Sequence, residues 1–111
     1  MSTEKPASST PAPVLLEANQ QIVLPGPVAL EALREIEYIL ISLRKISDHA
    51  LFNPEFDFDA ATAGFVVDGQ VRNRLAKVRK LLSERFDNSL GADDMGDIER
   101  YVEDLAFWKP A

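Results

Sequence analysis

The residues of this chain best suited to metal-dependent catalysis are the carboxylates of the run DDMGD at residues 93–97. In a helix, side chains three or four residues apart lie on one face, so Asp94 and Asp97 can act as a pair. Carboxylate oxygens are the ligands that Mg²⁺ prefers, and one such pair can hold one cation. The run is therefore the candidate site of a small helical Mg-dependent enzyme.

The same run reads DDxxD and resembles the magnesium–diphosphate motif of prenyltransferases. That resemblance implies a second acidic motif in a bundle longer than this chain, and the sequence contains no second copy. Small all-α nucleotide pyrophosphatases use E-x-x-E and E-x-x-D pairs on facing helices, whereas the pairs Glu84/Asp87 and Asp94/Asp97 flank one turn here. We therefore expect no metal site, no cofactor and no enzymatic activity.

Other catalytic chemistries lack the residues they need. The chain has no cysteine, which excludes disulfides, thiolate nucleophiles and cysteine-ligated metals. Its one histidine, His49, lies on the polar side of a predicted helix, and no G-x-S-x-G turn, P-loop or G-x-G-x-x-G run is present. We expect His49 to be a surface histidine near a helix C-terminus.

The composition limits where the protein acts and what it binds. The formal charge is −6 and the hydrophobic fraction is 46%, which indicates an acidic globular protein and argues against a dedicated nucleic-acid or membrane-surface protein. No apolar run approaches the ~20 residues that span a bilayer, and no export signal is evident. We expect a cytoplasmic protein.

Residues 27–51 form the clearest predicted helix. Pro27 suits the first helical turn, and Asn53-Pro54 supplies a stop. At 100° per residue the apolar side chains fall in one sector of roughly 140°, wide enough for contact with two neighbouring elements. The sector contains Val28, Ala29, Ala32, Leu33, Ile36, Ile39, Leu40, Leu43, Ile46, Ser47, Ala50 and Leu51.

Two further helices are predicted at about residues 69–87, with Asp68 as N-cap, and 93–108. Residues 72–85 carry six basic residues and one acid, whereas residues 93–104 carry six acids and one base. The short link near residues 88–92 predicts antiparallel neighbours whose charges set their pairing. Alternatively, one of these faces recognises a partner of opposite charge, which for the basic helix would be nucleic acid.

The remaining segments are a leader and a long connection. Residues 1–26 are rich in proline and serine and predict a flexible leader, whose apolar segments 14–16 and 22–24 pack on the domain or bind a partner. Residues 53–68 predict a partly structured loop, with a small β-hairpin as the alternative. The expected fold is therefore all-α: one domain at residues 27–111 with a three-helix core.

Exposed apolar and acidic side chains complete the prediction. Leu30, Tyr38 and Ile41 lie on the outer side of the first helix, where they form a partner site or dimer seam unless the leader covers them. The function predicted is a small, acidic, non-enzymatic protein-binding module: an adaptor, chaperone or immunity-type inhibitor of a basic partner, able to form a dimer. The alternatives are a nucleic-acid-associated regulator and the Mg-dependent enzyme. The predicted partner-binding residues are Tyr38, Ile41, Asp93, Asp97, Glu103 and Phe107.

Overall fold

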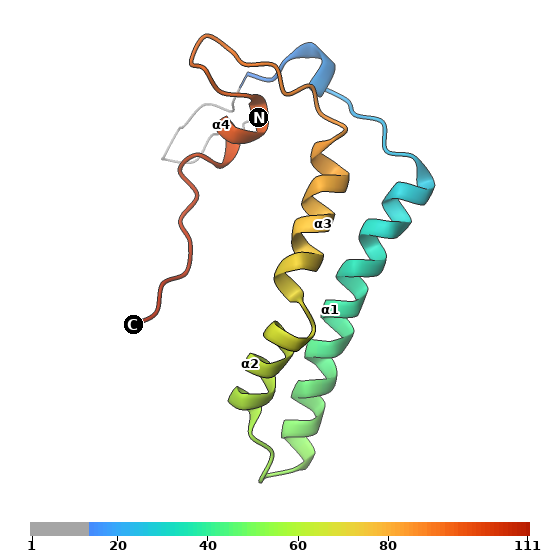
Figure 1. The fold of residues 1–111 in the computed structure, drawn as a ribbon, viewed down its shortest axis with the longest axis vertical. Helices are drawn as coiled ribbons and strands as arrows, with labels where there is room; N and C mark the ends of the chain where they lie inside the picture. Colours follow the sequence, from blue (N-terminus) through green and yellow to red (C-terminus); the bar gives the residue numbers. More distant parts are fainter. Residues whose placement is uncertain (1–13) are drawn as a thin grey trace, which may run out of the picture. The chain divides into compact units, whose positions relative to one another are not determined.

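The computed structural model describes residues 14–111, and every regular element in that range is a helix (Figure 1). The predicted all-α class is confirmed, and three helices pack together. Two compact units are present: Val23–Arg85, and a second one in which residues 14–22 and 86–111 are described. The elements are η1 (Glu17–Asn19), α1 (Gly26–Phe52), α2 (Phe58–Asp68), α3 (Val71–Ser83) and α4 (Asp97–Val102).

Helix α1 matches its predicted bounds to within one residue at each end. Pro25 is the N-cap and a proline follows in the first turn, where a missing N–H leaves no hydrogen bond unmade. The helix ends before Asn53, which is extended at φ −134° because a proline follows it.

The prediction of a loop at residues 53–68 is wrong for most of its length, because residues 58–68 form α2. Asp57 caps this helix, and its side chain accepts a hydrogen bond from the Ala60 N–H at 2.9 Å. Alanines at positions 60, 61 and 63 favour a helix, and this outweighs the alternation of phenylalanine and aspartate that indicated a strand. Residues 14–111 contain no strand, so the alternative hairpin is wrong too.

Helix α3 is shorter than the predicted 69–87. Gly69 closes α2, since its N–H donates to the Phe65 carbonyl at 2.7 Å, and Gln70 takes a left-handed conformation at φ 53°. This break separates α2 from α3, so Asp68 is the last residue of α2 and not the N-cap of α3.

The three helices of the first unit form a hairpin whose second arm is broken at Gln70. Helix α1 is one arm, and α2 and α3 follow one another back along it (Figure 1). Ion pairs set the antiparallel direction, because Glu35 meets Arg74 and Glu31 meets Lys77. The buried hydrophobic residues of the described chain are Ala32, Ile39 and Val78, which all lie between these arms.

The predicted helix at residues 93–108 is wrong outside α4, which spans only Asp97–Val102. Asp94 is left-handed at φ 67°, and Gly96 is extended, so the helix cannot begin earlier. Beyond α4, Leu105, Phe107 and Trp108 are exposed. A short helix is marginal in water without tertiary packing, and here no burial stabilises further turns.

The predicted leader, residues 1–26, can be compared with the structure only from residue 14, because residues 1–13 lie outside the described part of the chain. Residues 14–22 belong to the second unit, where the Leu16 N–H donates to the Asp97 carboxylate at 2.8 Å. The side chains of Val14 and Val23 are exposed, so packing of these two apolar segments is partial.

Candidate protein-binding surface

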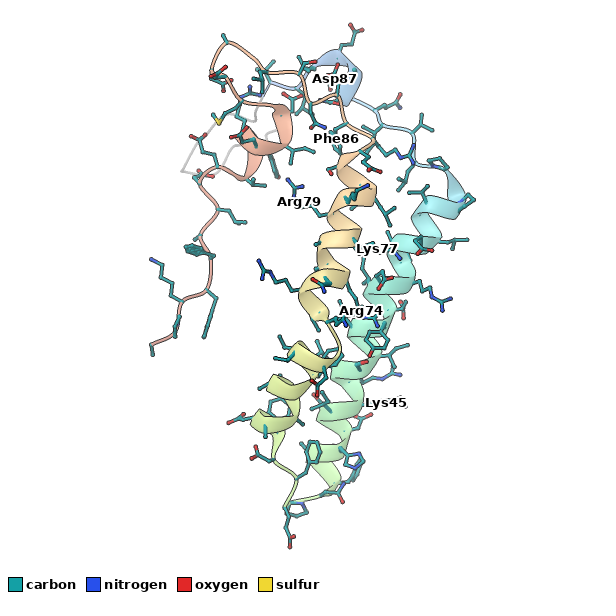
Figure 2. The ribbon with its side chains drawn as sticks, in the orientation of Figure 1. Lys45, Arg74, Lys77, Arg79, Phe86 and Asp87 are labelled. Carbon is teal, nitrogen blue, oxygen red and sulfur yellow. The ribbon has the colours of Figure 1, made fainter. Side chains whose placement is uncertain are left out.

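One face of the hairpin is held by ion pairs around a buried carboxylate, Glu35. It accepts hydrogen bonds from Arg74 at 2.9 Å and from Lys77 at 3.0 Å, and Lys77 also pairs with Glu31. The bonds from Lys77 and then Arg74 lower the pKa of Glu35, while bonds to Glu31 and Glu35 raise that of Lys77. Figure 2 shows Arg74 and Lys77 on the side of α3 toward α1. This network fixes α1 against α3.

Tyr38, a predicted partner residue, lies beside this network. The Arg74 guanidinium lies 3.7 Å from the centre of its ring, and the Phe65 ring centre is 6.0 Å away. Such cation–π contacts contribute about 0.5–1 kcal/mol at exposed sites. The inner part of the ring therefore serves packing within the hairpin, although the side chain is exposed at its edge.

The opposite side of α1 presents apolar side chains to solvent. Four leucines, here called the leucine stripe, repeat along α1 at helical spacing. Leu33, Leu40, Leu43 and Leu51 are 51%, 56%, 39% and 74% exposed. Ile41, another predicted partner residue, is also exposed, but at 100° per residue it lies about 80–160° around the helix from these leucines.

The leucine stripe extends onto α3. On each helix, buried residues lie between the ion-paired side chains and a second group of side chains: Ala32 and Ile39 on α1, and Val78 on α3, where the second group contains the exposed Leu75 and Leu82. The ion-paired side chains of the two helices meet on one face of the hairpin. The second groups lie on the other side of the buried residues and therefore share the opposite face. The hairpin thus has one polar, bonded face and one open apolar face.

Charged residues border the leucine stripe on its solvent side. Glu37 and Arg44 lie next to it, and Arg34 and Asp48 lie one step further around the helix. Within residues 14–111, none of these four makes an ion pair. Their charges are available to a partner.

The acidic cluster of residues 93–97 is organised around Arg100. Its guanidinium donates to Asp93 at 2.6 and 2.7 Å, to Asp97 at 2.9 Å and to the Met95 carbonyl at 2.8 Å. These contacts lower the pKa of Asp93 well below its usual range and raise that of Arg100. The two carboxylates that the sequence assigned to a partner are therefore bonded to a neighbouring residue.

Asp97 is also buried, at 4% exposure, through a residue that sequence reasoning missed. The side-chain amide of Asn19 donates to its Oδ2 at 2.7 Å and to the Asp87 carbonyl at 2.9 Å, and the Asp87 N–H donates back to Asn19 Oδ1 at 2.7 Å. The bonds from Asn19 and from the Leu16 N–H lower the pKa of Asp97. Asp97 faces inward and is inaccessible to a partner.

The last two predicted partner residues, Glu103 and Phe107, lie past α4 and are exposed. Lys109 places its ammonium 5.4 Å from the centre of the Phe107 ring. The six predicted residues thus divide between the two units: Tyr38 and Ile41 on α1, and the other four in residues 86–111.

In the described residues, no three histidine, aspartate or glutamate side chains converge as metal ligands would. Of the basic residues on α3, Arg74, Lys77 and Lys80 pair with glutamates, which leaves Arg72 and Arg79 outside any ion pair among residues 14–111. No helix in that range is long and apolar enough to cross a membrane.

Comparison with known protein families, curated proteins and solved structures finds no match for this chain.

Proposed function

We propose that this protein is a non-enzymatic protein-binding module, of the kind that adaptors, chaperones and immunity-type inhibitors represent, and that the leucine stripe is its binding surface. The observation that carries this proposal is the imbalance of burial in the hairpin. Three hydrophobic residues of the described chain are buried, whereas four leucines of one helix are exposed. Covering apolar surface contributes about 25 cal/mol per Å², so a helix with such a stripe gains stability from a partner.

The hairpin suits this role because α1 is fixed before binding. The Glu35 network ties α1 to α3 on the face away from the leucine stripe. A surface ordered in advance loses less conformational entropy on association. The bordering charges, Glu37 and Arg44, supply partner choice, while the leucines supply affinity.

The acidic cluster supports this function less well. Arg100 engages Asp93 and Asp97, so their charges are balanced locally. Residues 86–111 still carry seven acids against two bases. A partner with a basic surface would meet this segment, with Glu103 and Phe107 as its exposed contacts.

Photo-cross-linking in the organism that encodes the protein tests the proposal. The photoreactive residue p-benzoylphenylalanine replaces Leu33 or Leu40 in separate variants. Control variants carry it at Ala63 or Ala76, which are exposed on α2 and α3 away from the stripe. All four positions are exposed helical sites, so the variants should fold alike.

We expect protein adducts from the two leucine positions and none from the two alanine positions. The adduct mass then distinguishes a second copy from a different protein. Equal labelling at all four positions, or no adduct at any of them, would refute a binding role for the leucine stripe.

A further inference from the structure

The exposed side of α1 has a charge pattern that reverses about its own middle. Leu40 and Leu43, Glu37 and Arg44, and Arg34 and Asp48 are three pairs, each centred within one residue of Ile41. In both charged pairs one member is acidic and the other basic. Such a helix is complementary to a second copy of itself running in the opposite direction.

We propose that the occupant of the leucine stripe is a second copy of this chain, with the two α1 helices antiparallel about a two-fold axis near Ile41. This inference rests on the proposed function, because it uses the same surface. Leu40 of each copy packs against Leu43 of the other, and Glu37 of each meets Arg44 of the other. Two hairpins joined in this way form a four-helix bundle.

The charges specify the direction as well as the partner. In a parallel pair, each Glu37 would lie beside the other Glu37 and each Arg44 beside the other Arg44. Like charges at neighbouring positions destabilise a helix pair, whereas opposite charges stabilise it. The antiparallel arrangement turns both repulsive contacts into attractive ones.

The charge distribution along the hairpin favours the same arrangement. Around its bend it carries Glu55, Asp57 and Asp59, whereas α3 carries the exposed Arg72 and Arg79, and in the described chain none of these five enters an ion pair. A two-fold axis across α1 brings the acidic bend of one copy to the level of the basic α3 of the other. The attraction acts at both ends of the dimer.

The hairpin itself carries no net charge that would oppose this contact. Residues 23–85 contain nine acidic and nine basic residues, so the hairpin has a formal charge of zero. The charge of −6 comes from the rest of the chain. At physiological ionic strength, charges further apart than about 8 Å are largely screened.

The width of the apolar sector on α1 also calls for a second neighbour. The sector of roughly 140° suits contact with two elements at 100° per residue. Helices α2 and α3 together cover the part that contains Ala32 and Ile39, and the part with Leu33 and Leu40 stays open. A second α1 fills it.

Charge reversal tests the proposal on the full chain by sedimentation equilibrium between about 1 μM and 1 mM protein. Glu37→Arg and Arg44→Glu each create two like-charge contacts, and we expect each to weaken the dimer about 30-fold. An equimolar mixture of the two variants should recover the wild-type affinity as a heterodimer, because both contacts are attractive again. Lys45→Glu is the control: it changes the net charge as Arg44→Glu does, at an exposed position outside the pairs.

Circular dichroism verifies that each variant keeps its helix content, which these exposed positions should not alter. A wild-type chain that stays monomeric at 1 mM overturns the second copy as occupant, and so does a dimer that Arg44→Glu weakens no more than Lys45→Glu. If such a monomer still forms adducts with another protein at Leu40, the binding function stands without the dimer. If it forms none, both proposals fail.

Discussion

Replacing Asn19 should open the second unit, because this side chain links three segments of the chain. It joins η1 to residue 87 through two hydrogen bonds with the Asp87 backbone, and to α4 through Asp97. Asn19 is 4% exposed, so its hydrogen bonds are made away from bulk solvent. In Asn19→Ala all three hydrogen bonds are lost and the Asp87 N–H and carbonyl lose their partner.

The loss of stability in Asn19→Ala can be estimated from its two hydrogen bonds to the Asp87 backbone. Each intramolecular hydrogen bond contributes about 1 kcal/mol net, and a buried group left without a partner costs at least as much. Loss of the two bonds to Asp87 therefore destabilises the closed unit by about 2 kcal/mol. That free energy corresponds to a factor of about 30 in the equilibrium between closed and open forms. The bond to Asp97 adds to this effect.

Native-state hydrogen exchange measures the opening directly. The Leu16 amide, which donates to Asp97, and the Gly91 amide, which donates to the Met95 carbonyl at 2.9 Å, report the closed form in wild type and variant alike. We expect both to exchange about 30-fold faster in Asn19→Ala, given a loss of about 2 kcal/mol.

Two further variants make the test specific. Gln20→Ala, at the next position, removes one exposed side chain whose contact with the Leu15 carbonyl is long at 3.4 Å, and should leave both rates unchanged. Asn19→Asp keeps the shape of the side chain but sets a carboxylate against that of Asp97. Protection of the two amides in this variant should therefore improve as acid protonates one of the two carboxylates. If Asn19→Ala exchanges at the wild-type rate, Asn19 does not hold this unit together.

Two other predictions concern the glycines of the hairpin and the response to acid. Gly64→Ala should raise the free energy of unfolding by about 0.5–1 kcal/mol, because alanine favours the helix and its Cβ meets nothing within 4 Å. Gly69→Ala should lower it by about 1–3 kcal/mol, because its Cβ would lie 2.7 Å from the Phe65 carbonyl oxygen; denaturation of both variants in urea checks the opposite signs. Acid should destabilise the second unit: the folded pKa of Asp97 lies below its ordinary 3.8, so its contribution is complete above pH 3.8 and is lost as the pH falls below it. In Asp97→Asn the protection of the Leu16 amide should lose part of this pH dependence.

The sequence predicted the elements whose signals are local and long. The apolar period of α1 continues over 27 residues between prolines, so its bounds were correct to one residue. For α2, Asp57 and the alanines were visible signals, but residues 53–68 were predicted as a partly structured loop, with a small β-hairpin as the alternative. The predicted helix at residues 93–108 was too long for another reason: its apolar residues continue to Trp108, yet Tyr101, Leu105 and Trp108 are exposed in the described structure.

The sequence shows which residues of the candidate sites are charged, but it does not show which residues they bond to. Asp97 was selected for its charge, but its burial depends on Asn19, which lies 78 positions earlier. Glu35 lies outside the predicted apolar sector of α1, and it is the carboxylate that Arg74 and Lys77 bind. Both contacts join distant segments, and no periodicity within one segment reports them.

The same limit explains why the function proposed for α1 is argued from its exposed apolar face. The helical wheel of α1 indicates how many neighbours the helix needs, because the width of the apolar sector is a local property of the sequence. It does not indicate whether those neighbours belong to the same chain. The hairpin supplies one layer of neighbours, and the charges beside the open leucines reverse about Ile41, a pattern that the proposed antiparallel copy of the same helix would complete.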